Sequence, residues 1–202
     1  MNDAFSALQA TPDDGHRLSP VAAWDETTRP RNRAARRSPA PTERGLRAAQ
    51  SLLDVHAGLR DQLADIRELA DQVLAGTVSI GAARSVLNSM AVRQSNWSLG
   101  AYCASYCTVV AQHHYGEDEE IFPYLRRRDG ELSPVLDRLE AEHVAIHDLL
   151  DRIDRALVTL VDGQSAATEQ LRAVIDLFTD ALLSHLSYEE RELLQPMAEQ
   201  FR

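Results

Sequence analysis

Residues 133–157 read SPVLDRLEAEHVAIHDLLDRIDRAL, and the fold is decided by the pattern in this stretch. Ser133 and Pro134 are typical of a helix start, because serine caps free backbone N–H groups and proline is tolerated in the first turn. Apolar residues then recur at steps of three and four, which predicts an amphipathic helix that ends before Gly163. One position of the apolar stripe is a histidine. The stripe consists of Leu136, Leu139, His143, Ile146, Leu150, Ile153 and Leu157.

The same helical period occurs in three further segments of the chain. Thr42 is a capping residue for the first of them, and the Phe122-Pro123 pair is expected to close the second. Four long amphipathic helices with short connections predict an all-α protein, an antiparallel up-down four-helix bundle. The predicted ranges are 42–75 for the first helix, 93–119 for the second and from Ser165 for the fourth, with a short extra helix at 79–90 between the first two.

Each of the four stripes has a histidine at a position that its spacing assigns to the core. Two stripes add a glutamate one turn later, as H-x-x-x-E, and the predicted helix of residues 133–157 contains H-x-x-x-H instead. Residues four apart share one face of a helix, so each pair directs two side chains towards one point. The set is His56, His113 with Glu117, His143 with His147, and His185 with Glu189.

These polar residues predict a metal site inside the bundle. Burying imidazoles and carboxylates without partners is costly, and an apolar core gives no reason to accept them. Neutral imidazole and carboxylate are ligands for iron, manganese or zinc. Glutamates also bridge ions, so one small site can hold a pair.

Two positions stay open within this candidate site. His114 flanks Glu117 as well, and it would ligate beside or instead of His113, which the stripe favours. His147 lies one helical step off its stripe. A supporting role at the edge of the site is the alternative to direct ligation there.

Three stretches resemble the hemerythrin or HHE cation-binding domain family: HHYGEDEEIFP at 113–123, LEAEHVAIH at 139–147 and HLSYEERELLQP at 185–196. The resemblance covers roughly residues 45–200, and it implies a bundle with an oxygen-reactive, non-haem di-iron centre. By motif it implies that Glu117 and Glu189 bridge the ions. The histidine ligands that it implies are His56, His113, His143, His147 and His185.

The chain also departs from the oxygen-carrying members of this family. They place an aspartate five residues after the last-helix histidine, whereas Glu189 follows His185 by four. Metal binding is therefore expected, but reversible oxygen transport is not assumed. The resemblance implies a protein that handles O₂, NO or iron itself. The alternatives are a small redox enzyme acting on peroxide or a diatomic gas, and a bundle that a metal only stabilises.

The composition is that of a soluble cytoplasmic protein, with 44% hydrophobic and 26% charged residues. We find neither a secretory signal nor an apolar run long enough to span a bilayer. The net charge of −10 disfavours nucleic acid and anionic lipid as partners, and a monomer or small homo-oligomer is expected. Cys103 and Cys107 are interpreted as small packing residues in a reducing compartment.

Residues 1–41 have no helical period and are predicted to be a disordered or loosely attached tail, ahead of the bundle at 42–202. The basic stretch RPRNRAARRSPAP at 29–41 is interpreted as a solvated linker. Several acids near the candidate ligands are expected to form a solvated face. These are Asp118, Glu119, Glu120, Glu190 and Glu192.

Overall fold

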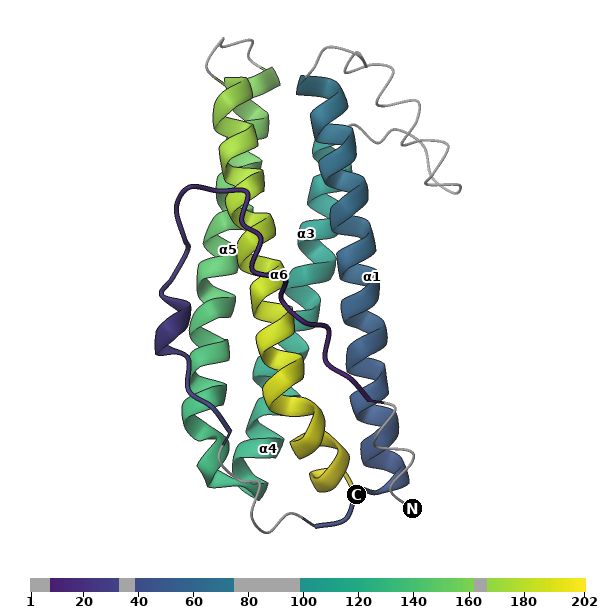
Figure 1. Cartoon of the computed structure of the whole chain (residues 1–202). Coiled ribbons are helices and arrows are strands. Elements are labelled where there is room, and N and C mark those ends of the chain that lie inside the picture. The colour runs from purple at the N-terminus through teal and green to yellow at the C-terminus, as the bar shows by residue number, and fades with distance from the viewer. Residues whose placement is uncertain (1–7, 33–38, 75–98, 162–166) are drawn as a thin grey trace, which may run out of the picture.

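The computed structural model describes residues 8–32, 39–74, 99–161 and 167–202. Within these ranges all regular structure is helical, which confirms the predicted all-α class. Four long helices run alternately up and down as a bundle (Figure 1). None of the helices in these ranges has an apolar stretch as long as a lipid bilayer requires. The four are α1 (Glu43–Leu74), α3 (Leu99–Gly116), α5 (Ser133–Val161) and α6 (Ala167–Gln200), and the extra helix predicted at 79–90 lies outside the described residues.

The start of α1 is held closely against the end of α6. Thr42 caps α1 as predicted, because its hydroxyl accepts a hydrogen bond of 2.9 Å from the N–H of Gly45. The N–H of Thr42 donates to the carbonyl oxygen of Ala198 at 2.9 Å. A Cβ atom on Gly45 would lie only 2.1 Å from that same oxygen. The missing side chain of Gly45 therefore allows the two helices to approach.

The second long helix does not end at Phe122-Pro123, so this prediction was wrong. A π-helical turn, η3 (Glu117–Ile121), joins α3 directly to α4 (Phe122–Arg128). The N–H of Phe122 donates to the carbonyl of Glu117, five residues earlier, so the turn accommodates one extra residue. Pro123 then falls in the first turn of α4, where a missing N–H is tolerated. A 3₁₀ turn, η4 (Gly130–Leu132), leads on into α5.

The apolar core consists of two clusters, and a layer of polar side chains separates them along the bundle. On α1, Leu52 belongs to one cluster and Leu59 to the other, with His56 between them in the chain. The polar residues are thus enclosed by apolar packing from both ends. The flanking residues on the other helices are Val110 and Phe122, Ile146 and Leu139, and Leu182 and Leu193.

Residues 8–32, here called the N-terminal strap, cross α6 and then descend beside α5 (Figure 1). They include a 3₁₀ turn, η2 (Glu26–Thr28). Backbone N–H groups of the strap donate to buried carboxylates of α6, so the prediction of a loosely attached tail was wrong for these residues. Such bonds leave no periodic signal in the sequence. The pairs are Thr11 with Glu190 at 2.6 Å, Leu18 with Asp180 at 2.9–3.0 Å, and Asn32 with Glu192 at 2.7 Å.

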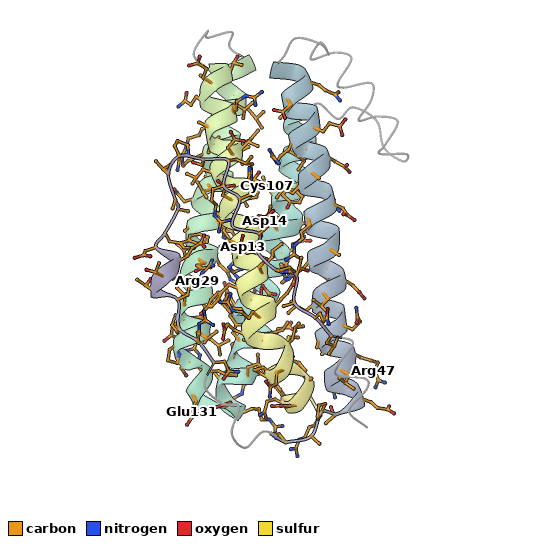
Figure 2. The ribbon with its side chains drawn as sticks, in the orientation of Figure 1. Asp13, Asp14, Arg29, Arg47, Cys107 and Glu131 are labelled. Carbon is orange, nitrogen blue, oxygen red and sulfur yellow. The ribbon has the colours of Figure 1, made fainter. Side chains whose placement is uncertain are left out.

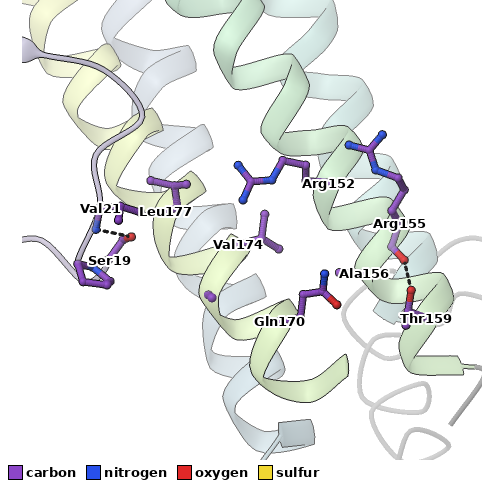
Figure 3. A pocket seen from close by; sticks show the side chains of 11 residues that line it. Ser19, Val21, Arg152, Arg155, Ala156, Thr159, Gln170, Val174 and Leu177 are labelled. Carbon is purple, nitrogen blue, oxygen red and sulfur yellow. Dashed lines mark hydrogen bonds between the residues drawn. The ribbon is translucent and has the colours of Figure 1, made fainter. Parts of the chain in front are cut away.

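A pocket of about 350 Å³ lies between the strap, α5 and α6 (Figure 3). Apolar side chains of Ala156, Val174 and Leu177 form part of its wall, with Arg152 and Arg155 beside them. Its lining contains neither histidine nor carboxylate. This pocket is therefore distinct from the polar layer in the core.

Candidate metal centre

The polar layer is built from imidazoles and carboxylates of α1, α3, η3, α5 and α6. All but one of the side chains are almost completely buried, and His113 is the exception with 10% of its side chain exposed. They form two groups, and in each group one ligand atom from every residue lies within 4.8 Å of the others. The first group is His56, His113, Glu117 and Glu189, and the second is His114, His143 and His185.

In the first group, two imidazoles face two carboxylates. The Nε2 atoms of His56 and His113 lie 3.1 Å apart. His56 Nε2 is 3.4 Å from Glu189 Oε2, and His113 Nε2 is 3.3 Å from Glu117 Oε1. Nitrogen and oxygen ligand atoms from three helices and the π turn thus converge on one point.

In the second group, three imidazoles from three helices surround a second point. The rings of His114 and His143 are stacked with centroids 4.0 Å apart and an interplanar angle of 7°. The His185 ring is nearly perpendicular to both, at 5.3 Å from His114 and 4.8 Å from His143. The open choice between His113 and His114 is therefore not exclusive, because each belongs to a different group.

The two glutamates lie between the groups. Glu117 has Oε1 beside His113 of the first group, and its Oε2 is 3.6 Å from His143 Nε2 of the second. Glu189 Oε2 is 3.4 Å from His56 Nε2 and 3.8 Å from His185 Nε2. Each carboxylate thus contacts an imidazole of both groups, which is the placement that a bridging ligand requires.

The layer fits bound cations, because many of its polar atoms have no other partner. Within the described part of the chain, both carboxylate oxygens of Glu117 and of Glu189 are buried without a hydrogen bond. The same holds for Nε2 of His143 and His185 and for both ring nitrogens of His114. Leaving such groups unpaired is costly. Imidazole nitrogen and carboxylate oxygen are donors that suit iron, manganese or zinc, and a cation would remove the cost.

Two imidazoles of the layer, His113 and His114, are held in the form that binds a metal. Burial lowers the pKa of His113 to about 3. Burial and the neighbouring imidazoles, His143 foremost, lower the pKa of His114 as well. Both rings are therefore neutral, which is the form that binds a metal. Burial and the nearby Glu189 raise the pKa of Glu117 well above its usual value, because two buried carboxylates repel each other when no cation lies between them.

Comparison with known protein families agrees with this geometry. The family model described as the hemerythrin HHE cation-binding domain matches residues 47–197. The chain belongs to this family. Neither the curated proteins nor the solved structures contain a match to the chain. Membership of the hemerythrin family confirms the resemblance that the sequence motifs indicated, and it accounts for a cation-binding layer in the core.

Three histidines of this hemerythrin-family centre are oriented by a carboxylate behind them. The Nδ1 atom of each ring lies 2.8–3.1 Å from a carboxylate oxygen, so Nε2 is the atom left for a metal. Such partners fix the orientation and the tautomer of a ligating histidine. The pairs are His56 with Glu190, His143 with Asp118, and His185 with Glu142.

Three buried acids in and around the centre differ from what the sequence indicated. Glu190 is fully buried and Glu192 is 5% exposed, so their assignment to a solvated face was wrong. Glu142, with 1% exposure, was not identified at all. Arg29, expected in a solvated linker, has only 7% of its side chain exposed and pairs with Glu142. Burial of these residues depends on the strap, which hydrophobic periodicity cannot predict.

His147 lies beside the second group and is not part of it. Its ring centroid is 5.4 Å from that of His114, and its Nε2 is buried without a hydrogen bond among the described residues. His114, whose ring stacks on that of His143, is the third imidazole of that group. The position of His147 favours a supporting role at the edge of the site over direct ligation, and both stay predictions.

Proposed function

We propose that this protein is a non-haem di-iron protein whose centre binds a small ligand such as O₂ or NO. The observation that carries this proposal is the position of Glu117 and Glu189, each of which lies between imidazoles of both groups. A mononuclear site would need only one group. Two carboxylates shared between two groups of imidazoles support a pair of ions held close together.

Each of the two groups would hold one ion. His56 and His113 hold one ion, and His114, His143 and His185 hold the other. Iron bound there supplies the redox and Lewis-acid chemistry that small oxygen and nitrogen species require. His113 has the only partly exposed side chain of the two groups. The small molecule therefore reaches the centre beside the ring of His113. The almost complete burial of the other side chains limits the size of that molecule.

The test is the metal content and optical spectrum of the full chain. We expect the purified protein, loaded with Fe²⁺ without oxygen and then oxidised, to contain a pair of iron ions per chain. Its near-ultraviolet charge-transfer absorption should respond to azide. His185→Ala and Glu117→Ala should each lose at least one ion, because each removes a ligand that no neighbour replaces.

Matched controls are available on the same chain. His16 is exposed on the strap, and Glu119 is exposed in the π turn two residues after Glu117. His16→Ala and Glu119→Ala should retain the full iron content and spectrum. Unchanged iron content in both ligand variants would exclude the proposed centre, and binding of zinc with no response to azide would favour a purely structural metal.

A further inference from the structure

The N-terminal strap contacts the carboxylates that lie directly behind two of the candidate ligands. One contact is made by Arg29 near the end of the strap, and the other by Thr11 near its start. Figure 2 shows Arg29 at the side of the bundle, where the strap descends beside α5. These two contacts lead to different groups of the metal centre.

The contact of Arg29 leads to the second group. Its Nε and Nη2 atoms donate to the two oxygens of Glu142, both at 2.8 Å. Glu142 Oε2 in turn lies 3.1 Å from His185 Nδ1. The guanidinium is fixed in place by Ser184 Oγ at 2.8 Å and by the ring of Tyr188, whose centroid lies 4.7 Å away. A bidentate pair of this kind sets the position and the plane of the carboxylate.

The contact of Thr11 leads to the first group. Its backbone N–H donates to Glu190 Oε2 at 2.6 Å. The other oxygen of Glu190, Oε1, lies 2.8 Å from His56 Nδ1. Glu190 is fully buried, so the strap supplies one of the donors that hold this carboxylate beneath the imidazole.

We propose that the N-terminal strap is a positioning element for the metal centre, with Arg29 acting through Glu142 on His185 and Thr11 acting through Glu190 on His56. This inference rests on the proposed function, since it needs a bound metal. It goes further by coupling a segment outside the bundle to both ions. Because such coupling is reciprocal, a bound metal must also favour the docked strap.

The bundle itself keeps each supporting carboxylate paired when the strap leaves. Arg138 of α5 donates to Glu142 Oε1 at 2.7 Å, and Arg60 of α1 donates to Glu190 Oε1 at 2.7 Å. Release of the strap therefore leaves neither Glu142 nor Glu190 without a cation. Its effect is a looser orientation of His56 and His185, and not collapse of the core.

The test compares Arg29→Ala with Arg17→Ala in the full chain. Arg17 is a strap arginine that pairs with Asp13 and Glu26 of the strap itself, so it is a matched control. Each variant is loaded with Fe²⁺ and mixed with a chromophoric chelator. We expect Arg29→Ala to release one ion several-fold faster than the wild type, which is less than the roughly 10- to 100-fold cost of losing the histidine's own carboxylate partner. Arg17→Ala should match the wild type.

Hydrogen exchange of the strap supplies the reciprocal measurement. Fe²⁺ loading should slow exchange of the Thr11 amide in the wild type, and it should slow it less in Arg29→Ala. Arg29→Lys retains one charged donor to Glu142 and should release iron at an intermediate rate, which also covers the case that Arg29→Ala does not fold.

The outcomes separate this inference from the proposed function. If the wild type binds a pair of iron ions, but Arg29→Ala releases them as slowly as Arg17→Ala, the strap is not a positioning element and the di-iron proposal stands. Exchange of the Thr11 amide that is the same with and without iron overturns the inference in the same way. A wild type that binds no iron overturns both.

Discussion

His114 is a buried imidazole of the metal centre in which both ring nitrogens lack a hydrogen-bond partner among the described residues. It has no exposed surface. One of these nitrogens lies within 4.8 Å of ligand atoms of His143 and His185. Since each of those two rings is held by a carboxylate at Nδ1, their Nε2 atoms and one nitrogen of His114 define one cation position.

We therefore predict that His114→Ala loses the ion of the second group, whereas His147→Ala retains it. The reason is that His147 lies beyond His114 and belongs to neither group. Iron analysis per chain after gel filtration measures the difference directly. Loss of iron from His147→Ala and not from His114→Ala would show that the two rings exchange roles when the metal binds.

For Cys107, the interpretation as a small packing residue is sufficient. It packs against the apolar cluster that contains Leu59, and burial raises the pKa of its thiol to about 11. A thiol with so high a pKa is a poor nucleophile and a poor metal ligand at neutral pH. This agrees with a packing role, while the side chain of Cys103 lies outside the described residues.

At the scale of elements, the π turn η3 explains why the sequence predicted the candidate ligands of this segment more accurately than it predicted the end of the helix that carries them. A regular stripe through Tyr106 and Val110 places Glu117 correctly on the inner face. Beyond Glu117, the next buried position is Phe122, a step of five residues that no α-helix makes. A regular step of four would place Ile121 at that position, and a helical period of 3.6 contains no sign of an inserted residue.

The contact between α1 and α6 leads to a paired prediction at the same scale. Gly45→Ala should lower the free energy of unfolding by about 1–3 kcal/mol, because its Cβ overlaps the backbone of α6 and the helices must move apart. Gly58 lies on the same helix with no atom within 4 Å of an added Cβ. Gly58→Ala should therefore raise stability by about 0.5–1 kcal/mol, since alanine favours a helix.

Urea titration of both variants measures these changes. An unchanged midpoint for Gly45→Ala would mean that the helices separate there without loss, and the close approach would then be of no structural importance. A lower midpoint for Gly58→Ala would contradict the open surroundings of that position.

At the scale of the whole molecule, the sequence predicted the bundle and much of its polar layer, and it did not predict the strap. Helices and core ligands follow from one period, so His56, His143 and His185 could be identified from spacing alone. The strap instead docks through backbone donors and through Arg29, which binds a glutamate far away in the chain. The acids that receive it are indistinguishable in sequence from solvated ones.

The core consists of two apolar clusters around a polar layer. Replacing one carboxylate of that layer should therefore change stability in opposite directions without metal and with metal. Without metal, Glu117 is a buried carboxylate with no hydrogen bond among the described residues, so Glu117→Leu should raise the melting temperature of the chelated protein.

With metal at a hundredfold excess over its dissociation constant, the wild type should gain roughly 2.7 kcal/mol, or about 5–10 °C for a chain of this size. Glu117→Leu should lose most of this gain, and the exposed Glu119→Ala should keep all of it. Thermal melts with chelator and with Fe²⁺ test both signs, and a Glu117→Leu protein that is less stable than the wild type after chelation would mean that this carboxylate serves the fold and not the metal.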